Sequence, residues 1–229
     1  MKHADCAKDY KHLVNFHQIK GDSPTGCPLF CLSVMTISQV ERLETGLIIL
    51  YLQDFEADFS RILNEFFNAS PHWNHSHKIR GRWENTYAPI DKVPAVRGIL
   101  SLAAQNASKC FQKQLICGHG MLKNSFWFNS MHHGDETGWH DHKAKAYASG
   151  VCYLQVTEDS GNFLYRLPQG EIRNIVPETG MMLLFNSNLS HSVEPSKSRK
   201  ERISLAFNLF TLPLEMEEDD PFGGHILLG

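Results

Sequence analysis

The hydrophobic pattern of this 229-residue chain changes character near residue 115. Upstream, the stretches 36–70 and 96–112 carry apolar residues three to four positions apart, which is helical spacing. Downstream, short apolar and β-branched runs alternate with recurring turn signals built on Gly, Pro, Asp and Ser. Helices followed by a series of short strands predict an α+β fold, in which the strands close into a sandwich or a barrel.

The expected elements divide the chain into three parts of one integrated domain. Residues 1–114 form an N-terminal lead-in and a helical support region, residues 115–212 form the β core, and residues 213–229 form an acidic, Gly-rich tail. The strands of the β core are predicted at Phe126–Phe128, Gly150–Val156, Gly161–Leu164, Glu171–Val176, Met181–Phe185 and Ile203–Phe210.

The support region is expected to contain helices separated by a loop. Residues 36–70 predict one or two amphipathic helices, residues 71–89 predict a loop rich in aromatic residues and histidine, and residues 96–112 predict a further helix. Because each helix has one apolar stripe, we expect the helices to cover one outer face of the major sheet.

Composition excludes several classes of protein. The formal net charge of -3 and the lack of a basic stripe argue against a nucleic-acid binder. No apolar run reaches the ~18 residues of a membrane-spanning helix, so no membrane association is expected. The polar N-terminus lacks a signal peptide, and the 6 cysteines show no CxxC spacing, so we expect free thiols and a cytoplasmic location. The sequence does not indicate an oligomeric state.

A cluster of histidines is the clearest chemical feature. In Gly138-Trp139-His140-Asp141-His142, successive side chains of a strand would point to opposite faces, so His140 and His142 would share one face and Asp141 the other. Two imidazoles in this arrangement can bind one first-row metal ion. A third histidine, His191, follows the apolar strand at 181–185 and is a candidate third ligand.

An arginine near the end of the β core adds an anion site. Arg202 opens a strand and would share a face with Ser204. A guanidinium binds a carboxylate through two parallel hydrogen bonds, and a serine hydroxyl adds one donor. An arginine in an otherwise apolar strand needs an anionic partner if it is buried.

These stretches resemble the 2-oxoglutarate- and iron(II)-dependent oxygenases, and more narrowly a branch that carries H-x-H where most relatives carry H-x-D. The resemblance spans about residues 124–210. It rests on the stretches His140–His142, Ser149–Leu154, Ser160–Leu164, Pro177–Phe185, Ser190–Val193 and Arg202–Ser204. It implies a double-stranded β-helix, or jelly roll, with iron bound by His140 and His191, and the distal carboxylate of 2-oxoglutarate bound by Arg202 and Ser204.

The remaining metal ligand is open at this point. Strand geometry favours His142, whereas most relatives of the family use a carboxylate, which here could be Asp135 or Asp141. Asn129 and Tyr153 are further candidates to line the 2-oxoglutarate pocket.

The resemblance implies an oxygenase that uses dioxygen and decarboxylates 2-oxoglutarate to succinate. We expect it to hydroxylate a small polar metabolite, such as an amino acid or a natural-product intermediate. The substrate rim is expected around 72–87, with Arg80, Arg82 and Trp83. The alternative is a cupin-like metal-binding protein, or a three-histidine dioxygenase that does not use 2-oxoglutarate.

Overall fold

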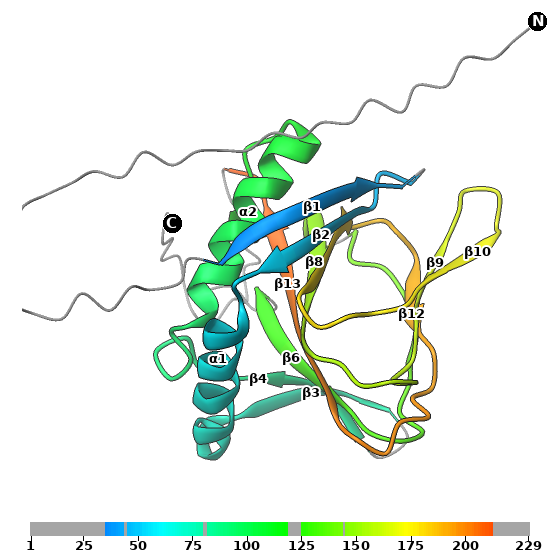
Figure 1. Ribbon diagram of the computed structural model, residues 1–229. Coiled ribbons are helices and arrows are strands. Elements are labelled where there is room, and N and C mark those ends of the chain that lie inside the picture. The colour runs from blue at the N-terminus through cyan, green and yellow to red at the C-terminus, as the bar shows by residue number, and fades with distance from the viewer. Residues whose placement is uncertain (1–34, 44, 80–81, 119–124, 144, 213–229) are drawn as a thin grey trace, which may run out of the picture. The chain divides into compact units, whose positions relative to one another are not determined.

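The computed structural model describes residues 35–43, 45–79, 82–118, 125–143 and 145–212. The expected lead-in, the acidic tail and Arg80 lie outside these residues. The two sheets in this part of the chain are antiparallel throughout, and they lie face to face as a double-stranded β-helix (Figure 1). This confirms the predicted α+β jelly roll.

The larger sheet has the strand order β1-β2-β11-β8-β13-β6-β4-β3, with β5 paired to β13, and the smaller sheet has the order β10-β9-β12-β7. The strands of the larger sheet are β1 (Thr36–Arg42), β2 (Ile48–Gln53), β3 (Asn74–Ile79), β4 (Arg82–Tyr87), β5 (Ile116–Cys117), β6 (Phe126–Met131), β8 (Ala148–Gln155), β11 (Met181–Asn186) and β13 (Arg202–Phe210). The strands of the smaller sheet are β7 (Thr137–His140), β9 (Phe163–Arg166), β10 (Ile172–Ile175) and β12 (His191–Val193).

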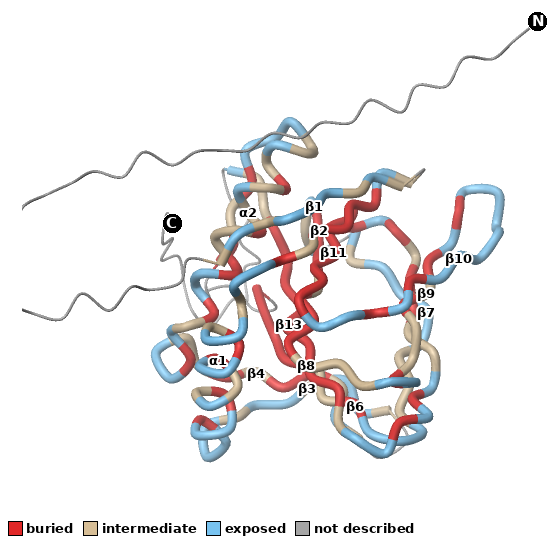
Figure 2. The backbone as a smooth tube through the Cα atoms, in the orientation of Figure 1, coloured by how far each residue is buried: buried red, intermediate tan, exposed pale blue. Residues whose placement is uncertain are grey.

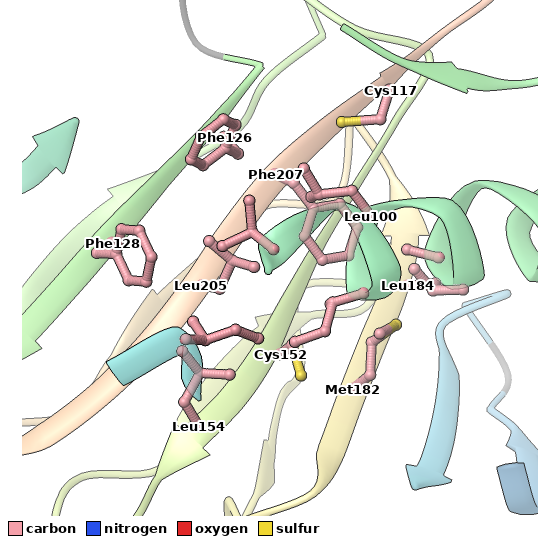
Figure 3. Packing of buried hydrophobic residues seen from close by; sticks show 14 of the residues in the cluster. Leu100, Cys117, Phe126, Phe128, Cys152, Leu154, Met182, Leu184, Leu205 and Phe207 are labelled. Atoms are coloured by element: carbon pink, nitrogen blue, oxygen red, sulfur yellow. The ribbon is translucent and has the colours of Figure 1, made fainter. Parts of the chain in front are cut away.

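Two helices cover one face of the larger sheet, as the sequence predicted (Figure 1). They are α1 (Glu56–Asn68), which is followed by a 3-10 turn at Ser70–His72, and α2 (Val96–Phe111). Figure 3 shows Leu100 of α2 packed among the sheet residues Leu184 and Phe207. Among the described residues, neither helix has the length and apolar character needed to cross a bilayer.

Strand β13 shows how the two faces of the larger sheet differ. The side chains of Ile203, Leu205, Phe207 and Leu209 belong to the core under the helices. The intervening side chains of Arg202, Ser204, Ala206 and Asn208 line a cavity between the two sheets. The residues of β13 and its neighbours are buried along most of these strands (Figure 2), so most of their side chains lie in one interior or the other.

The predicted helix over the first part of 36–70 is wrong. Residues 36–53 form the hairpin β1–β2, which adds two strands to the sheet beyond β11, and only Glu56–Asn68 is helical. Three successive residues of β2 are buried, so the strand lacks the alternation of polar and apolar residues. Its apolar residues therefore also fit the spacing of a helix. Gly46, at φ 73°, forms the turn that a helix would not contain.

The predicted loop at 71–89 is also wrong, because most of it forms the hairpin β3–β4. This hairpin lies at the edge of the larger sheet, next to β6, and most of β3 is exposed. An edge strand exposed to water needs no apolar alternation, so its polar sequence resembles a loop. The predicted strands of the β core are all present, with ends that differ by a few residues.

Candidate metal and 2-oxoglutarate site

The three candidate histidines lie together in the cavity between the sheets. His140 on β7 and His191 on β12 are direct partners across the smaller sheet, with ring centroids 4.2 Å apart. His142 follows just after the end of β7, and its ring centroid is 5.2 Å from each of the other two. One ligand nitrogen from each ring lies within 4.8 Å of the others, which is a spacing that a single metal ion could bridge.

Each of the three imidazoles is oriented by a hydrogen bond at Nδ1. The acceptors are the carbonyl of Gly138 for His140, at 2.8 Å, and the carbonyl of Leu189 for His191, at 2.9 Å. Because a carbonyl can only accept, these two rings carry their proton on Nδ1 and keep Nε2 as a lone-pair donor. Such hydrogen bonds fix the tautomer and orientation of metal-binding histidines.

His142 is held by two buried polar side chains. Its Nδ1 lies 2.9 Å from Oδ1 of Asn208 and 2.9 Å from Oγ of Ser149. The Ser149 hydroxyl itself donates to the same Asn208 oxygen at 2.7 Å, so that oxygen faces both groups. This pair of residues was not predicted. Extending the alternation of Arg202 and Ser204 along the strand would have placed Asn208 on the same face.

Burial keeps two of the histidines in the neutral form that binds metals. Desolvation lowers the pKa of His142 to about 4, although the hydrogen bond to Asn208 opposes this change. Desolvation and the nearby His140 also lower the pKa of His191 well below its ordinary value. Neutral imidazoles at pH 7 are ready ligands for a divalent metal ion.

The two candidate carboxylates lie outside this group of ligand atoms. Asp135 accepts a hydrogen bond from the backbone N–H of His132 at 2.7 Å, and its other oxygen lies 3.2 Å from Nε of Arg82. Asp141 faces Lys143, with its carboxylate 3.5 Å from the ammonium nitrogen. The geometry therefore favours a three-histidine site over either carboxylate alternative.

Arg202 is a buried cation at the other end of the same cavity. Its side chain is 2% exposed, and its Nη1 donates to the carbonyls of Ser160 and Gly161 at 3.0 and 2.8 Å. Its Nη2 donates to the thioether of Met131, and its buried Nε has no hydrogen-bond partner. Among the described residues no carboxylate forms an ion pair with it. A buried guanidinium in this state is suited to a carboxylate ligand, because an uncompensated buried charge is costly.

The other predicted residues of the 2-oxoglutarate pocket lie in register beside Arg202. Ser204 pairs with Asn129 of β6 on one side and with Tyr153 of β8 on the other. All four residues line the cavity, whose volume is about 350 Å³. Burial raises the pKa of Tyr153 to about 12, so its hydroxyl stays protonated and can donate a hydrogen bond.

The predicted substrate rim is present only in part. Arg82 donates to the backbone carbonyls of Ser130 and Glu136, and Trp83 is exposed and stacks on His75, so neither lines the cavity. The hairpin β3–β4 instead contributes His77, Ile79, Glu84 and Asn85 to the cavity wall. No alternation in the sequence of this hairpin could have selected these four residues.

Comparison with known proteins agrees with the site. Residues 165–208, which include His191 and Arg202, match the family model described as "Putative 2OG-Fe(II) oxygenase". This part of the chain is similar to the 2-oxoglutarate- and iron(II)-dependent oxygenases. No curated protein matches its sequence significantly.

Solved structures with a similar fold include two prolyl hydroxylases and an alpha ketoglutarate dependent carbocyclase. A prolyl-4-hydroxylase from Pseudomonas putida has 21% sequence identity and a TM-score of 0.53, with 73% of this chain and 94% of that chain covered. A prolyl hydroxylase from Trichoplax adhaerens, in complex with a hypoxia inducible factor peptide fragment, has 15% identity and a TM-score of 0.57, with 73% and 84% covered. The carbocyclase SnoK of nogalamycin biosynthesis has 12% identity and a TM-score of 0.59, with 73% and 80% covered.

The residues of the site fit iron(II) and 2-oxoglutarate. Three imidazoles with free Nε2 atoms are suitable ligands for iron(II), and they leave coordination positions for a bidentate ligand and dioxygen. The unpartnered Nε of buried Arg202 lies on the wall of the same cavity and suits a carboxylate. The chain therefore presents a metal-binding end and an anion-binding end in a single cavity.

Proposed function

We propose that this oxygenase couples the decarboxylation of 2-oxoglutarate to succinate with the hydroxylation of a small polar metabolite. In this proposal His140, His142 and His191 bind iron(II). Arg202, with Ser204, binds the distal carboxylate of 2-oxoglutarate, and Asn129 and Tyr153 line its pocket. Bound iron(II) supplies the activation of dioxygen. The observation that carries the proposal is the buried Arg202 without an acidic partner, on the same cavity wall as the histidine cluster.

The protein contributes orientation and a dry environment. Phe163 and Phe185 pack against His191 with ring centroids 5.4 and 4.8 Å away, so one side of the metal site is apolar. The hydrogen bonds at Nδ1 hold the three rings before a metal ion binds, which lowers the ordering cost of binding. The protonated hydroxyl of Tyr153 and the Ser204 hydroxyl supply donors for a carboxylate.

The cavity supports a small substrate. Its volume of about 350 Å³ is at the lower end of ligand pockets, and 2-oxoglutarate would take part of it. The structurally similar SnoK comes from nogalamycin biosynthesis, and the prolyl hydroxylase from Trichoplax adhaerens was solved with a peptide fragment, so the fold supports both small molecules and peptides as ligands. Hydroxylation is the simplest outcome, and we expect the reaction to take place in the cytoplasm.

The alternative is a metal-binding protein of the cupin type, or a three-histidine dioxygenase that acts without 2-oxoglutarate. Such a protein has no use for a carboxylate-binding arginine in its cavity. The burial of Arg202 at 2% exposure, with an unpartnered Nε, is the observation against this alternative.

Anaerobic titration tests the proposal directly. Iron(II) followed by 2-oxoglutarate should produce a visible charge-transfer absorption, and admitting air should release succinate in proportion to the 2-oxoglutarate consumed. Replacing His191 with Ala should remove both signals, whereas replacing the exposed Glu158 with Gln should change neither. A protein that binds iron(II) but shows no absorption change with 2-oxoglutarate would support the alternative.

A further inference from the structure

The side of the cavity formed by the hairpin β3–β4 carries two polar groups that the proposed function does not use. His77 and Glu84 both line the cavity. The flanking pairs Ser76–Asn85 and Lys78–Trp83 place His77 directly opposite Glu84 across the hairpin. Neighbours across an antiparallel pair are close enough to act on one ligand.

The backbone of His77 has a conformation that is rare inside a strand. Its φ is 57°, in the left-handed region, although it is not glycine and lies in the middle of β3. A residue in this region is strained and persists only where its surroundings impose it. Residues of this kind are concentrated at functional sites, so the distortion marks His77 as more than an ordinary strand residue.

A chain of hydrogen bonds determines which nitrogen of His77 carries the proton. The amide Nδ2 of Asn129 donates to the backbone carbonyl of Glu84 at 2.9 Å, which fixes the orientation of this amide, because a carbonyl cannot donate. The same nitrogen donates to Oδ1 of Asn85 at 3.0 Å. The Asn85 Nδ2 is therefore the atom that lies 3.2 Å from Nδ1 of His77, and it donates to that nitrogen.

The tautomer of His77 follows from this chain. Because Nδ1 accepts from Asn85, the neutral ring carries its proton on Nε2. The Ser76 hydroxyl, 2.7 Å from the same Nδ1, can act as a second donor. His77 therefore offers one N–H donor on Nε2, and Asn129 connects this side of the cavity to the strand that carries Ser204.

Glu84 offers the complementary charge. It is half-buried, and in the described part of the chain its carboxylate has neither a hydrogen bond nor an ion pair. The other carboxylate on the cavity wall, Asp141, already faces Lys143. The indole of Trp127 lines the same cavity, and indole faces attract cations.

The charges of the cavity point to an amine. The carboxylates of 2-oxoglutarate would bind Arg202 and the metal ion, and Glu84, which has no ion pair among the described residues, is then the anionic group available to a substrate. Lys145 also lines the cavity and can face a substrate carboxylate. A free amino acid carries both charges, whereas an anionic metabolite would meet an uncompensated carboxylate at Glu84.

We propose that Glu84 and His77 form the substrate-recognition subsite for a small molecule with a protonated amine, foremost a free amino acid. Glu84 binds the ammonium group, and the Nε2–H of His77 donates to an oxygen next to it. This proposal rests on the proposed function, because it assigns a substrate to the same cavity.

The test compares amines with their acetylated forms. The probes are the common free amino acids and their N-acetyl derivatives, added to the iron-loaded enzyme with 2-oxoglutarate, and succinate release is measured. At least one free amino acid should stimulate release more than 10-fold over its N-acetyl form. Calorimetry with manganese(II) in place of iron should show the same preference in binding, without turnover.

Two variants and one spectrum complete the test. Glu84→Gln should raise the KM for the stimulating amino acid at least 10-fold, with a smaller effect on kcat, whereas the exposed control Glu158→Gln should leave KM unchanged. Nitrogen-15 NMR of the metal-free protein should show the Nε2–H tautomer of His77, and Asn85→Leu should shift this equilibrium.

The outcomes separate the two proposals. Stimulation by acidic or neutral compounds alone, no stimulation by any amine, or an unchanged KM in Glu84→Gln would overturn the amine subsite. In each of these cases the charge-transfer absorption with 2-oxoglutarate would still support the proposed function. Loss of that absorption in the wild-type protein would overturn the proposed function instead.

Discussion

Replacing Arg202 with Gln removes the buried charge at the anion-binding end of the cavity. The glutamine side chain is uncharged and ends near the position of the arginine Nε, so the hydrogen bonds of Nη1 to the carbonyls of Ser160 and Gly161 are lost as well. What is lost is the cation that would bind the distal carboxylate of 2-oxoglutarate. Arg202→Lys serves as the control, because it keeps the charge but not the forked geometry.

The expected effect on 2-oxoglutarate binding is large. Removing one partner of a buried, hydrogen-bonded charge pair costs about 2–5 kcal/mol, which corresponds to a Kd raised by about 30-fold to several thousand-fold. Arg202→Lys should lose less, since a charge remains in place. Binding of the metal ion alone should be unchanged, because all three histidines and their Nδ1 partners remain.

Thermal unfolding with manganese(II) gives a direct measurement of this loss. At a 2-oxoglutarate concentration of 100 Kd, the wild-type protein should gain about 2.7 kcal/mol of stability, or about 5–11 °C in Tm. At the same concentration a 30-fold weaker variant should gain only about 0.9 kcal/mol, or about 2–4 °C. If Arg202→Gln shows the full wild-type shift, the carboxylate binds elsewhere and the assignment of Arg202 is wrong.

Three further predictions concern other parts of the structure. Asn208→Leu should weaken cobalt(II) binding about 10- to 100-fold, because the ring of His142 loses the hydrogen bond that orients it. Asn208→Asp keeps the acceptor and should bind cobalt(II) as tightly as the wild-type protein. Equal affinities in Asn208→Leu and the wild-type protein would show that Asn208 does not position the ring. Gly150→Ala should lower the free energy of unfolding by about 1–3 kcal/mol in urea, because the new Cβ would lie 2.6 Å from the Phe207 ring. Gly98→Ala in α2, where a Cβ meets nothing within 4 Å, should raise the free energy of unfolding by about 0.5 kcal/mol. The reverse order of stability would contradict this packing. Complete burial raises the pKa of the Cys152 thiol, so Cys152 should resist alkylation in the native protein, while the partly exposed Cys110 reacts. Detection of alkylated Cys152 by mass spectrometry of the folded protein would refute this prediction.

The β core was predictable because the residues suited to bind a metal ion or an anion also show the alternation of a β-strand. The strands there are bounded by turn residues, and β13 carries its polar site residues at every second position, as in Arg202 and Ser204. The spacing of His140 and His142 indicated one shared metal site, and the structure brings these two rings together with His191. That Asp135 pairs with Arg82 and lies apart from the histidines could not be predicted, because this ion pair is a long-range contact.

The N-terminal half was less predictable for two opposite reasons. Strand β2 is buried on both faces, so it lacks the alternation that distinguishes a strand from a helix. Strand β3 is exposed on most of its length, so it lacks apolar residues that would distinguish a strand from a loop. In both strands the missing signal depends on the neighbours in the sheet, and these come from distant parts of the sequence.

Along β13, alternate side chains are under different constraints during evolution. Side chains at odd positions from Ile203 to Leu209 hold the helices onto the sheet, while those at even positions from Arg202 to Asn208 face the cavity. A substitution at an even position can alter reactivity or substrate choice while the helix-facing packing stays intact, and the two sets can be varied almost independently. A library for new specificity should therefore randomise the cavity-facing positions of β6, β8 and β13 and keep their alternate positions fixed.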